Sequence, residues 1–264
     1  MTDTLSANWS LKEEIRTYWG LRAATFDDAF GHRIPPGPEF DAWSRVLEAH
    51  LGPAPLRVLE LASGTGEVSR VLLSLGHDLT GIDFAEPMLE RCRAKHRGDP
   101  RAVFRLGDAE NTMEPDGAYD AVVCRHLVWT LTDPVAALRD WHRVLRPGGR
   151  LVIFDGDFVN LPWRGRLARR AIETLAKVSG TGAGRHRDPS LDAQHARILS
   201  GLPFNKGLRF PTLALLVEEA GFAAVRRESY APVLAALRRI APGAQEWLRT
   251  FLHDRFVLVA RKPD

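Results

Sequence analysis

Short apolar runs alternate with amphipathic segments through the middle of the chain, and this alternation limits the possible folds more than any other feature. Apolar runs typical of strands cover residues 56–61, 78–83, 102–106, 119–124 and 150–154. Segments with apolar residues three or four positions apart, typical of helices, cover residues 67–75, 86–96 and 134–144. Strands that alternate with helices form parallel sheets through right-handed crossovers. We therefore predict an α/β fold built on a doubly wound parallel sheet.

The two flanks of this region complete the expected architecture. Strand-like segments at residues 223–229 and 256–260 bring the sheet to seven strands, with helices on both of its faces. Residues 156–210 are long, basic and helix-prone, and an insertion of this size is usually functional. The expected parts are an N-terminal helical cap (1–50), a core (51–155), a helical lid insertion (156–212) and the C-terminal part of the core sheet (213–264).

Composition argues against several classes of protein. The chain has 264 residues, of which 45% are hydrophobic and 26% are charged, as in ordinary globular proteins. It holds no apolar run long enough for a membrane span, and its first residues lack the apolar segment of a secretory signal. Cys92 and Cys124 stand far apart, so neither a disulfide framework nor a zinc site is indicated. We expect no metal, no membrane partner and a cytoplasmic location.

Positive charge is concentrated in one segment. The net charge is +3, but residues 156–215 alone hold 10 basic and 4 acidic residues. This surplus comes without a nucleic-acid reading motif, so no nucleic-acid partner is expected. Two interpretations stay open: the segment binds an acidic group of a small-molecule substrate, or it forms the solvated face of helices. The sequence also leaves the oligomeric state open, a homodimer included.

A glycine-containing loop, Glu60-Leu61-Ala62-Ser63-Gly64-Thr65-Gly66, ends the first predicted strand. Ligands of open α/β sheets bind beyond the carboxyl ends of the strands, where glycines allow a close approach. A dinucleotide-binding loop needs a third glycine, but Ser69 stands at that position. Glu67 would also oppose a pyrophosphate at the helix N-terminus. The loop therefore argues against a nicotinamide cofactor, and Glu60 suits a cationic ligand.

This loop resembles motif I of the class I S-adenosylmethionine (SAM) dependent methyltransferases, with Ala62 in place of the first glycine. Further motifs follow in the family's order at the ends of the second and third strands, and the Leu145–Leu151 turn and the antiparallel last strand, Phe256–Ala260, also match. The resemblance implies SAM as cofactor and a set of cofactor-binding residues. These are Glu60, Leu61, Ala62, Ser63, Gly64, Thr65, Gly66, Asp83, Phe84, Met88, Gly107, Asp108, Ala109 and Arg125.

The resemblance assigns particular roles within this set. Asp83 is expected to bind both ribose hydroxyls, because a carboxylate accepts two hydrogen bonds. Phe84 and Met88 are expected to contact the adenine, and Asp108 to accept from its amino group. Each residue also has a plain structural interpretation: Asp83 as the cap of the next helix, for example, and Asp108 as an ordinary loop acid.

Candidate catalytic groups follow the fourth and fifth strands. His126 suits a general base, because the unperturbed pKa of histidine lies near neutrality. Asp155 and Asp157 end the fifth strand, where either could bind a substrate hydroxyl or amine. The alternatives are that Arg125 and His126 only shape the pocket, and that the two aspartates form a turn and a cap.

Candidate substrate residues come from the two flanks. The resemblance places Tyr18 over the cofactor. Trp19 and His32 are further candidates, the latter for the mouth of the site, and the alternatives are a core position for Trp19 and a surface position for His32. In the lid insertion, Trp163 and Phe204 are candidates, together with His186. Arginines at positions 164, 166, 169, 170, 185 and 187 could meet a carboxylate or phosphate.

The sequence therefore predicts a SAM-dependent methyltransferase acting on an oxygen or nitrogen, less readily a carbon, of a small molecule. Three alternatives remain: SAM chemistry without methyl transfer, such as cyclisation of SAM; a nicotinamide-dependent oxidoreductase; and a non-catalytic SAM-binding partner.

Overall fold

The computed structural model describes residues 2–179 and 189–264 and contains a seven-stranded sheet in the order β3-β2-β1-β4-β5-β7-β6. The strands are β1 (Arg57–Leu61), β2 (Asp78–Asp83), β3 (Ala102–Leu106), β4 (Tyr119–Arg125), β5 (Leu145–Asp157), β6 (Ala223–Glu228) and β7 (Asp254–Arg261). Six strands are parallel, and β7 runs antiparallel to both of its neighbours. The predicted doubly wound sheet with an antiparallel last strand is confirmed.

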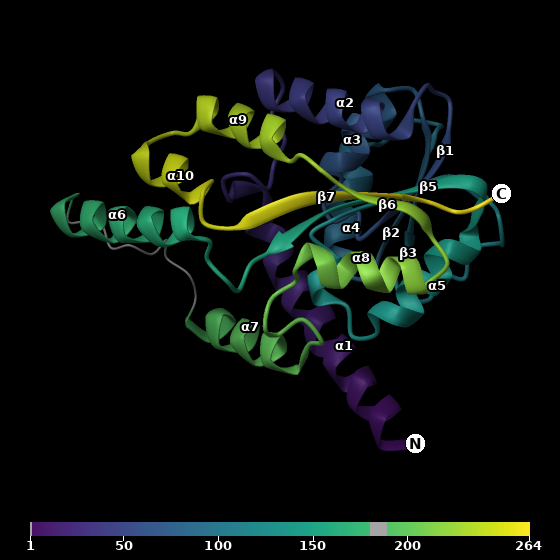
Figure 1. Cartoon of the computed structure of the whole chain (residues 1–264), viewed down its shortest axis with the longest axis horizontal. Coiled ribbons are helices and arrows are strands. Elements are labelled where there is room, and N and C mark those ends of the chain that lie inside the picture. Colours follow the sequence, from purple (N-terminus) through teal and green to yellow (C-terminus); the bar gives the residue numbers. More distant parts are fainter. Residues whose placement is uncertain (1, 180–188) are drawn as a thin grey trace.

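Helices cover both faces of the sheet (Figure 1). Apolar side chains of α2 (Pro38–Leu51), α3 (Glu67–Ser74) and α9 (Ala231–Ile240) pack on one face around the fully buried Trp43 and Phe154. Those of α5 (Pro134–Val144) and α8 (Phe210–Glu219) pack on the other face around Trp141 and Phe256. The helix α4 (Glu86–Lys95) lies beside β2 and β3. Because these two apolar layers hold the strands together, the carboxyl ends of the parallel strands lie along one edge of the sheet.

The remaining helices lie at the carboxyl edge of the sheet. They are α1 (Thr2–Arg22), α6 (Trp163–Ser179), α7 (Pro189–Gly201), α10 (Ala244–Arg249) and the short 3-10 helices η1 (Ala23–Asp28) and η2 (Val128–Thr130). The helix α1 packs against α4 and α7, whereas α6 packs against α10 (Figure 1). Within the described ranges, no helix combines the length and apolar character that crossing a bilayer requires.

One element boundary differs from the prediction. The strand β5 begins at Leu145, before the Pro147-Gly148-Gly149 turn, because Leu145 pairs with Tyr119 across a bulge. The sequence also predicts a helix over about residues 234–250 with an interruption near Pro242, and the structure divides it there into α9 and α10, since Ala241 is extended and Gly243 is not helical. The division places α10 against α6.

Candidate functional site

Two non-glycine residues with left-handed backbone mark the carboxyl edge of the sheet. Ala62 follows β1 with φ of 52°, and His126 follows β4 with φ of 55°. Such conformations are costly for residues with a Cβ and concentrate at functional sites. A hydrogen bond of 2.8 Å from the His126 N–H to the Phe154 carbonyl holds the second of these turns. The chain therefore bends sharply at the ends of two adjacent strands.

The glycine loop between β1 and α3 has one open position and one packed position. At Gly64, with φ of +55°, an added Cβ would come within 4 Å only of the Ala62 carbonyl, at 3.9 Å. At Gly66, with φ of +85°, a Cβ would lie 2.7 Å from both Cys92 Sγ and His96 Nε2. Gly64 thus leaves room for a ligand, whereas Gly66 lets α3 pack against α4. Thr65 Oγ1 ties the loop to Asp27 at 2.6 Å.

Glu60 is buried beneath this loop. Its Oε2 accepts a hydrogen bond of 2.5 Å from Ser69 Oγ, and its side chain is 3% exposed. Burial raises the pKa of Glu60 to about 8, and the nearby Asp83 carboxylate adds to the rise. The role of Glu60 in binding a cation stays a prediction.

Glu60→Gln is expected to stabilise the protein at pH 8 and to have no such effect near pH 4. The folded state retains a proton on Glu60 after the unfolded state has released it, so stability falls as pH rises from about 4.5 to about 8. Glutamine cannot ionise, and the melting temperature of the variant should exceed that of the parent by on the order of 5 °C at pH 8. Thermal unfolding across this pH range checks it. Asp116→Asn, at an exposed acid, is the control; a pH-independent difference would contradict the assignment.

Asp83 is the last residue of β2, and its carboxylate already accepts two backbone hydrogen bonds. Its Oδ2 accepts from the Gly64 N–H at 2.8 Å and its Oδ1 from the Ala85 N–H at 2.9 Å. Burial raises the pKa of Asp83 to about 6, against the effect of these amides. A carboxylate has about four acceptor positions, so two remain for a ligand.

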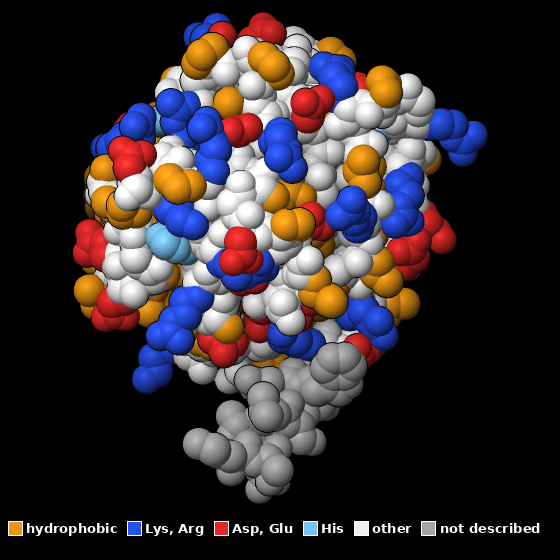
Figure 2. Space-filling view, turned by 90° about the vertical axis from the view of Figure 1, so that its right-hand side faces the viewer, with side chains coloured by type: hydrophobic (Ala, Val, Ile, Leu, Met, Phe, Trp, Pro, Cys, Tyr) orange, Lys and Arg blue, Asp and Glu red, His pale blue; other side chains and the backbone are white. Residues whose placement is uncertain are grey.

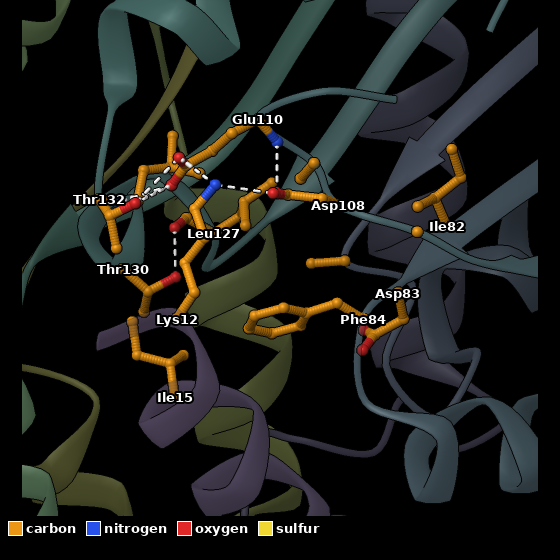
Figure 3. A pocket seen from close by; sticks show the side chains of 14 residues that line it. Lys12, Ile15, Ile82, Asp83, Phe84, Asp108, Glu110, Leu127, Thr130 and Thr132 are labelled. Atoms are coloured by element: carbon orange, nitrogen blue, oxygen red, sulfur yellow. Dashed lines mark hydrogen bonds and ion pairs between the residues drawn. The ribbon is translucent and has the colours of Figure 1, made fainter. Parts of the chain in front are cut away.

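A pocket lies between these strand ends and α1 (Figure 3). Its apolar wall includes Ala62, Ile82 and Phe84, and its polar rim includes Asp83 and Asp108. The remaining lining residues are Lys12, Ile15, Gly107, Ala109, Glu110, Leu127, Thr130, Leu131 and Thr132. The pocket therefore combines the ends of β1, β2, β3 and β4, as the sequence predicts for a nucleoside site.

Lys12 of α1 reaches across this pocket (Figure 3). Its ammonium lies 2.7 Å from both Asp108 Oδ2 and Glu110 Oε2. Burial disfavours the charge on Lys12, but the bonds to the two acids outweigh it and hold its pKa above the ordinary value. Asp108, the expected acceptor for the adenine amino group, is thus bonded to Lys12 of the first helix. A bound nucleoside would have to displace the Lys12 ammonium from Asp108.

Arg125 joins the end of β4 to the N-terminal segment. Its guanidinium donates to the carbonyls of Gly31 at 2.5 Å and His32 at 3.1 Å, and it lies 5.0 Å from the centre of the Trp43 ring. The His32 ring bonds to the Phe26 carbonyl at 3.0 Å. Burial and the nearby Arg125 lower the pKa of His32 to about 4. Arg125 and His32 therefore build the wall beside His126.

The imidazole of His126 is half-buried, and its surroundings disfavour a positive charge on it. Burial, followed by the charges of Arg125 and Arg255, holds the pKa of His126 well below its usual range. Its Nδ1 makes no hydrogen bond to any described residue. A neutral ring with an unpaired nitrogen can accept a proton or bind a hydroxyl.

A row of rings extends from His126 to α1. Phe158 lies 5.1 Å from His126 and 5.8 Å from Trp129, between ring centres, and His253 lies 5.3 Å from Phe158. The row continues through His195 of α7, which lies 5.8 Å from Trp129 and stacks at 5.3 Å on Tyr18. We call these six side chains the ring row. Flat ring faces of this kind suit a planar acceptor.

A second cation lies beside the ring row. Arg255 at the start of β7 lies 6.0 Å from the centre of the Tyr230 ring, next to Gly156 in the strand register. In the described part of the chain, neither Arg255 nor Arg125 forms an ion pair with a carboxylate. The buried Glu39 interacts with both at longer range, and its own pKa is raised to about 7 by burial. The field around His126 is therefore positive.

The two aspartates after β5 hold backbone turns. Asp155 accepts from the Val128 N–H at 2.9 Å and the Gly156 N–H at 2.8 Å, and burial raises its pKa to about 7. Asp157 accepts from the Val159 and Asn160 N–H groups at 3.0 and 2.8 Å. Asp155 thereby fixes η2 next to His126. A direct catalytic role for either stays a prediction.

The other predicted site residues that the structure describes do not line the pocket. Trp19 and Met88 pack with Ala23 where α1 and η1 meet α4. Phe204 is buried in the apolar layer beneath α5 and α8, and Trp163 is 60% exposed on α6, so the structure brings neither to His126. The remaining candidates His186, Arg185 and Arg187 lie outside the described residues.

Sequence reasoning missed several site residues. The histidine and arginine at the start of β7, His253 and Arg255, could have been found, because an antiparallel last strand begins at the edge where its parallel neighbours end. Lys12 and Ile15 lie three positions apart on α1 and share one helix face, but only the placement of α1 brings them to the pocket. Nothing in the local sequence singles out Trp129, Phe158 or His195.

Comparison with known proteins identifies what this chain is similar to. The methyltransferase domain family matches residues 59–153. A demethylmenaquinone methyltransferase of Clavibacter sepedonicus is 31% identical over 188 residues, which cover 69% of this chain and 72% of that protein. A ubiquinone/menaquinone biosynthesis C-methyltransferase, UbiE, of Methylobacterium nodulans is 31% identical over 196 residues, covering 70% of this chain and 73% of that protein.

Other relatives match over a shorter stretch, and the chain covers about half of the length of each of three of them. Among solved structures, phosphoethanolamine N-methyltransferase 2 of Haemonchus contortus in complex with SAM has a TM-score of 0.63 at 16% identity. The likeness covers 93% of this chain and 57% of that one. At this identity it concerns the fold alone.

Proposed function

Because the chain belongs to the class I SAM-dependent methyltransferases, we propose that it transfers a methyl group to a ring carbon of a small phenolic or quinol acceptor. The observation that carries this proposal is His126 at the end of β4, a member of the ring row whose half-buried imidazole disfavours a charge and has a buried nitrogen without a hydrogen bond to any described residue. The names of two relatives, a demethylmenaquinone methyltransferase and a C-methyltransferase, support the choice of carbon over the oxygen or nitrogen favoured by the sequence.

The pocket residues fit the cofactor SAM, whose bound form supplies a methyl group on a positively charged sulfur. Asp83 keeps two acceptor positions for ribose hydroxyls, and Gly64 leaves space for a close approach. Ala62, Ile82 and Phe84 supply apolar surface for the base. Asp108 would receive the adenine amino group in exchange for Lys12.

On the acceptor side, His126 would take the proton of the ring hydroxyl at an imidazole nitrogen. Loss of that proton spreads negative charge onto the ring carbons, which makes carbon a nucleophile. A ring carbon would then accept the methyl group as its bond to sulfur breaks and S-adenosylhomocysteine leaves, and the hydrogen on that carbon would depart as a proton, which restores the ring. Arg125 and Arg255 would stabilise this charge, since a fixed positive field in a buried site acts most strongly where charge develops. The ring row would hold the acceptor flat and exclude water.

Transfer from SAM labelled with carbon-13 in its methyl group tests the proposal. The protein is incubated with labelled SAM and a panel of chemically reduced naphthoquinones and simple phenols, with protein-free reactions as controls. We expect a product whose labelled methyl carbon couples directly to a ring carbon in NMR spectra. Label found only on oxygen or nitrogen would contradict the proposed carbon acceptor. SAM binding without transfer to any acceptor in the panel would contradict the proposed acceptor class.

A further inference from the structure

The helix α6 has three different sides. Its inner side carries Ala168, Ile172 and Ala176, which recur every four residues and are each 5–6% exposed. Gly165 allows the close contact with the segment after α10, because a Cβ there would lie 2.6 Å from the Leu252 carbonyl oxygen. This side anchors α6 to the rest of the protein, so the orientation of its other sides is fixed.

A second side of α6 is apolar and exposed. Trp163 and Leu167 are 60% and 55% exposed, and Leu175 and Val178 are 38% and 83% exposed. Residues three, four, seven or eight apart lie on one side of a helix. These four residues therefore form one stripe, which we call the α6 stripe. The guanidinium of Arg164 lies 5.2 Å from the centre of the Trp163 ring, so a cation also borders the stripe.

The third side is basic. Arg166, Arg170 and Lys177 are all exposed, and their spacing of four and seven residues places them in one row beside the α6 stripe. The whole helix carries five basic residues and one acidic residue. That acid, Glu173, lies 3.7 Å from Arg169, so it does not neutralise the row.

This combination differs from the face of the molecule nearest the C-terminus. There, basic and acidic side chains alternate with isolated apolar ones (Figure 2). Scattered apolar side chains are normal on a protein surface, whereas a contiguous stripe marks an interaction site. In Figure 1, α6 also extends from the body at the side farthest from the C-terminus, where a flat partner could reach it.

We propose that α6 docks the protein onto the surface of an anionic lipid bilayer, with the α6 stripe among the acyl chains and the basic row over the headgroups. A helix with Trp and Leu on one side and Arg and Lys beside them lies in the plane of such an interface. Tryptophan favours the headgroup level, and each cation gains from the negative surface potential. A nucleic acid would satisfy the basic row but not the apolar stripe.

Docking would bring a bilayer close to the acceptor side of the site. A groove beside α6 is lined by Val159, Leu161, Ile172 and Leu252 together with the charged Arg169, Glu173 and Arg249, and Val159 directly follows Phe158 of the ring row. An acceptor held in the lipid could therefore reach the site along the apolar part of this groove. This consequence rests on the proposed function, whereas docking itself does not.

Vesicle flotation of the full chain tests the proposal. We expect binding to vesicles containing about 30% phosphatidylglycerol in phosphatidylcholine, weak binding to phosphatidylcholine alone, and release by salt. Leu167→Ser with Val178→Ser, and separately Arg166→Gln with Arg170→Gln, should each weaken binding at least about tenfold. Leu215→Ser, 56% exposed on α8, and the exposed Arg139→Gln on α5 are matched controls and should bind like the parent.

Three results would overturn docking. The first is equal flotation of the α6 variants and the parent. The second is equal binding to neutral and anionic vesicles. The third is a dimer, seen by light scattering, that the serine variants dissociate, because the α6 stripe would then meet a second copy of the chain. None of these readouts depends on turnover, so they separate docking from the proposed function.

Discussion

His126→Asn is expected to lower kcat by about 10²- to 10⁴-fold, the range for loss of a positioned general base. Asparagine tolerates the left-handed backbone at this position, so the turn after β4 should persist. The dissociation constant of SAM should change less than about twofold, because no cofactor contact is assigned to the imidazole. Initial rates and calorimetry on the same preparations measure both quantities.

Acceptors whose hydroxyl groups differ in acidity can show whether His126 acts as a base or only packs in the pocket. An acceptor with a more acidic hydroxyl needs less help to lose its proton, so the variant should lose least activity with it. Desolvation and the charges of Arg125 and Arg255 hold the pKa of His126 well below its usual range, so protonation of this base should not lower the parent rate between pH 8 and about pH 6. His142→Asn on α5 serves as the matched control. A collapse of SAM affinity in His126→Asn, or an equal loss with every acceptor, would make His126 a pocket residue.

The sheet was predictable because its signals are local. Each strand is a short apolar run, and each crossover helix carries its own apolar face, so the order of elements follows from periodicity. The glycine loop was equally readable: Ser69, which replaces the third glycine of a dinucleotide loop, bonds to Glu60 instead. Two residues argue against a nicotinamide cofactor. Ser69 replaces the third glycine, and Glu67 places at the start of α3 a carboxylate that binds Lys95 and Arg70.

The acceptor side was harder to predict because its residues meet only through long-range packing. Lys12 and Asp108 are 96 positions apart, and Arg125 bonds to carbonyls more than 90 positions earlier. The ring row joins α1, η2, α7 and the ends of β4, β5 and β7. The excess charge of the lid insertion was visible in the sequence, but its separation into an apolar and a basic side of α6 required the orientation of the helix.

Asp83→Ala is expected to weaken binding of S-adenosylhomocysteine by about 10- to 150-fold, which corresponds to about 1.5–3 kcal/mol for hydrogen bonds to a charged group. Two acceptor positions of Asp83 hold the Gly64 and Ala85 amides, and the other two are assigned to the ribose hydroxyls. Calorimetry with the product avoids any dependence on the acceptor.

The loss alone would not separate ribose binding from a loosened glycine loop, because Asp83 also holds Gly64. Deoxyribose analogues of S-adenosylhomocysteine make the distinction as a double-mutant cycle. The unmutated protein should bind the 2′-deoxy and 3′-deoxy analogues more weakly than S-adenosylhomocysteine itself. The Asp83→Ala variant should bind all three ligands with the same affinity. Asp108→Ala, at the opposite side of the pocket, should keep the full discrimination. If Asp83→Ala still discriminates, the carboxylate holds the loop rather than the ribose.

The pH dependence gives an independent check on the same group. The pKa of Asp83 is raised to about 6 by burial, and only the ionised form offers all four acceptor positions. Affinity of the parent should therefore be full above about pH 7 and fall as pH decreases through about 6. Asp83→Ala should lack this decrease, since the titrating group is gone. A decrease of the same size in both proteins would assign the titration to another group, with Glu60 beneath the same loop as the nearest buried acid.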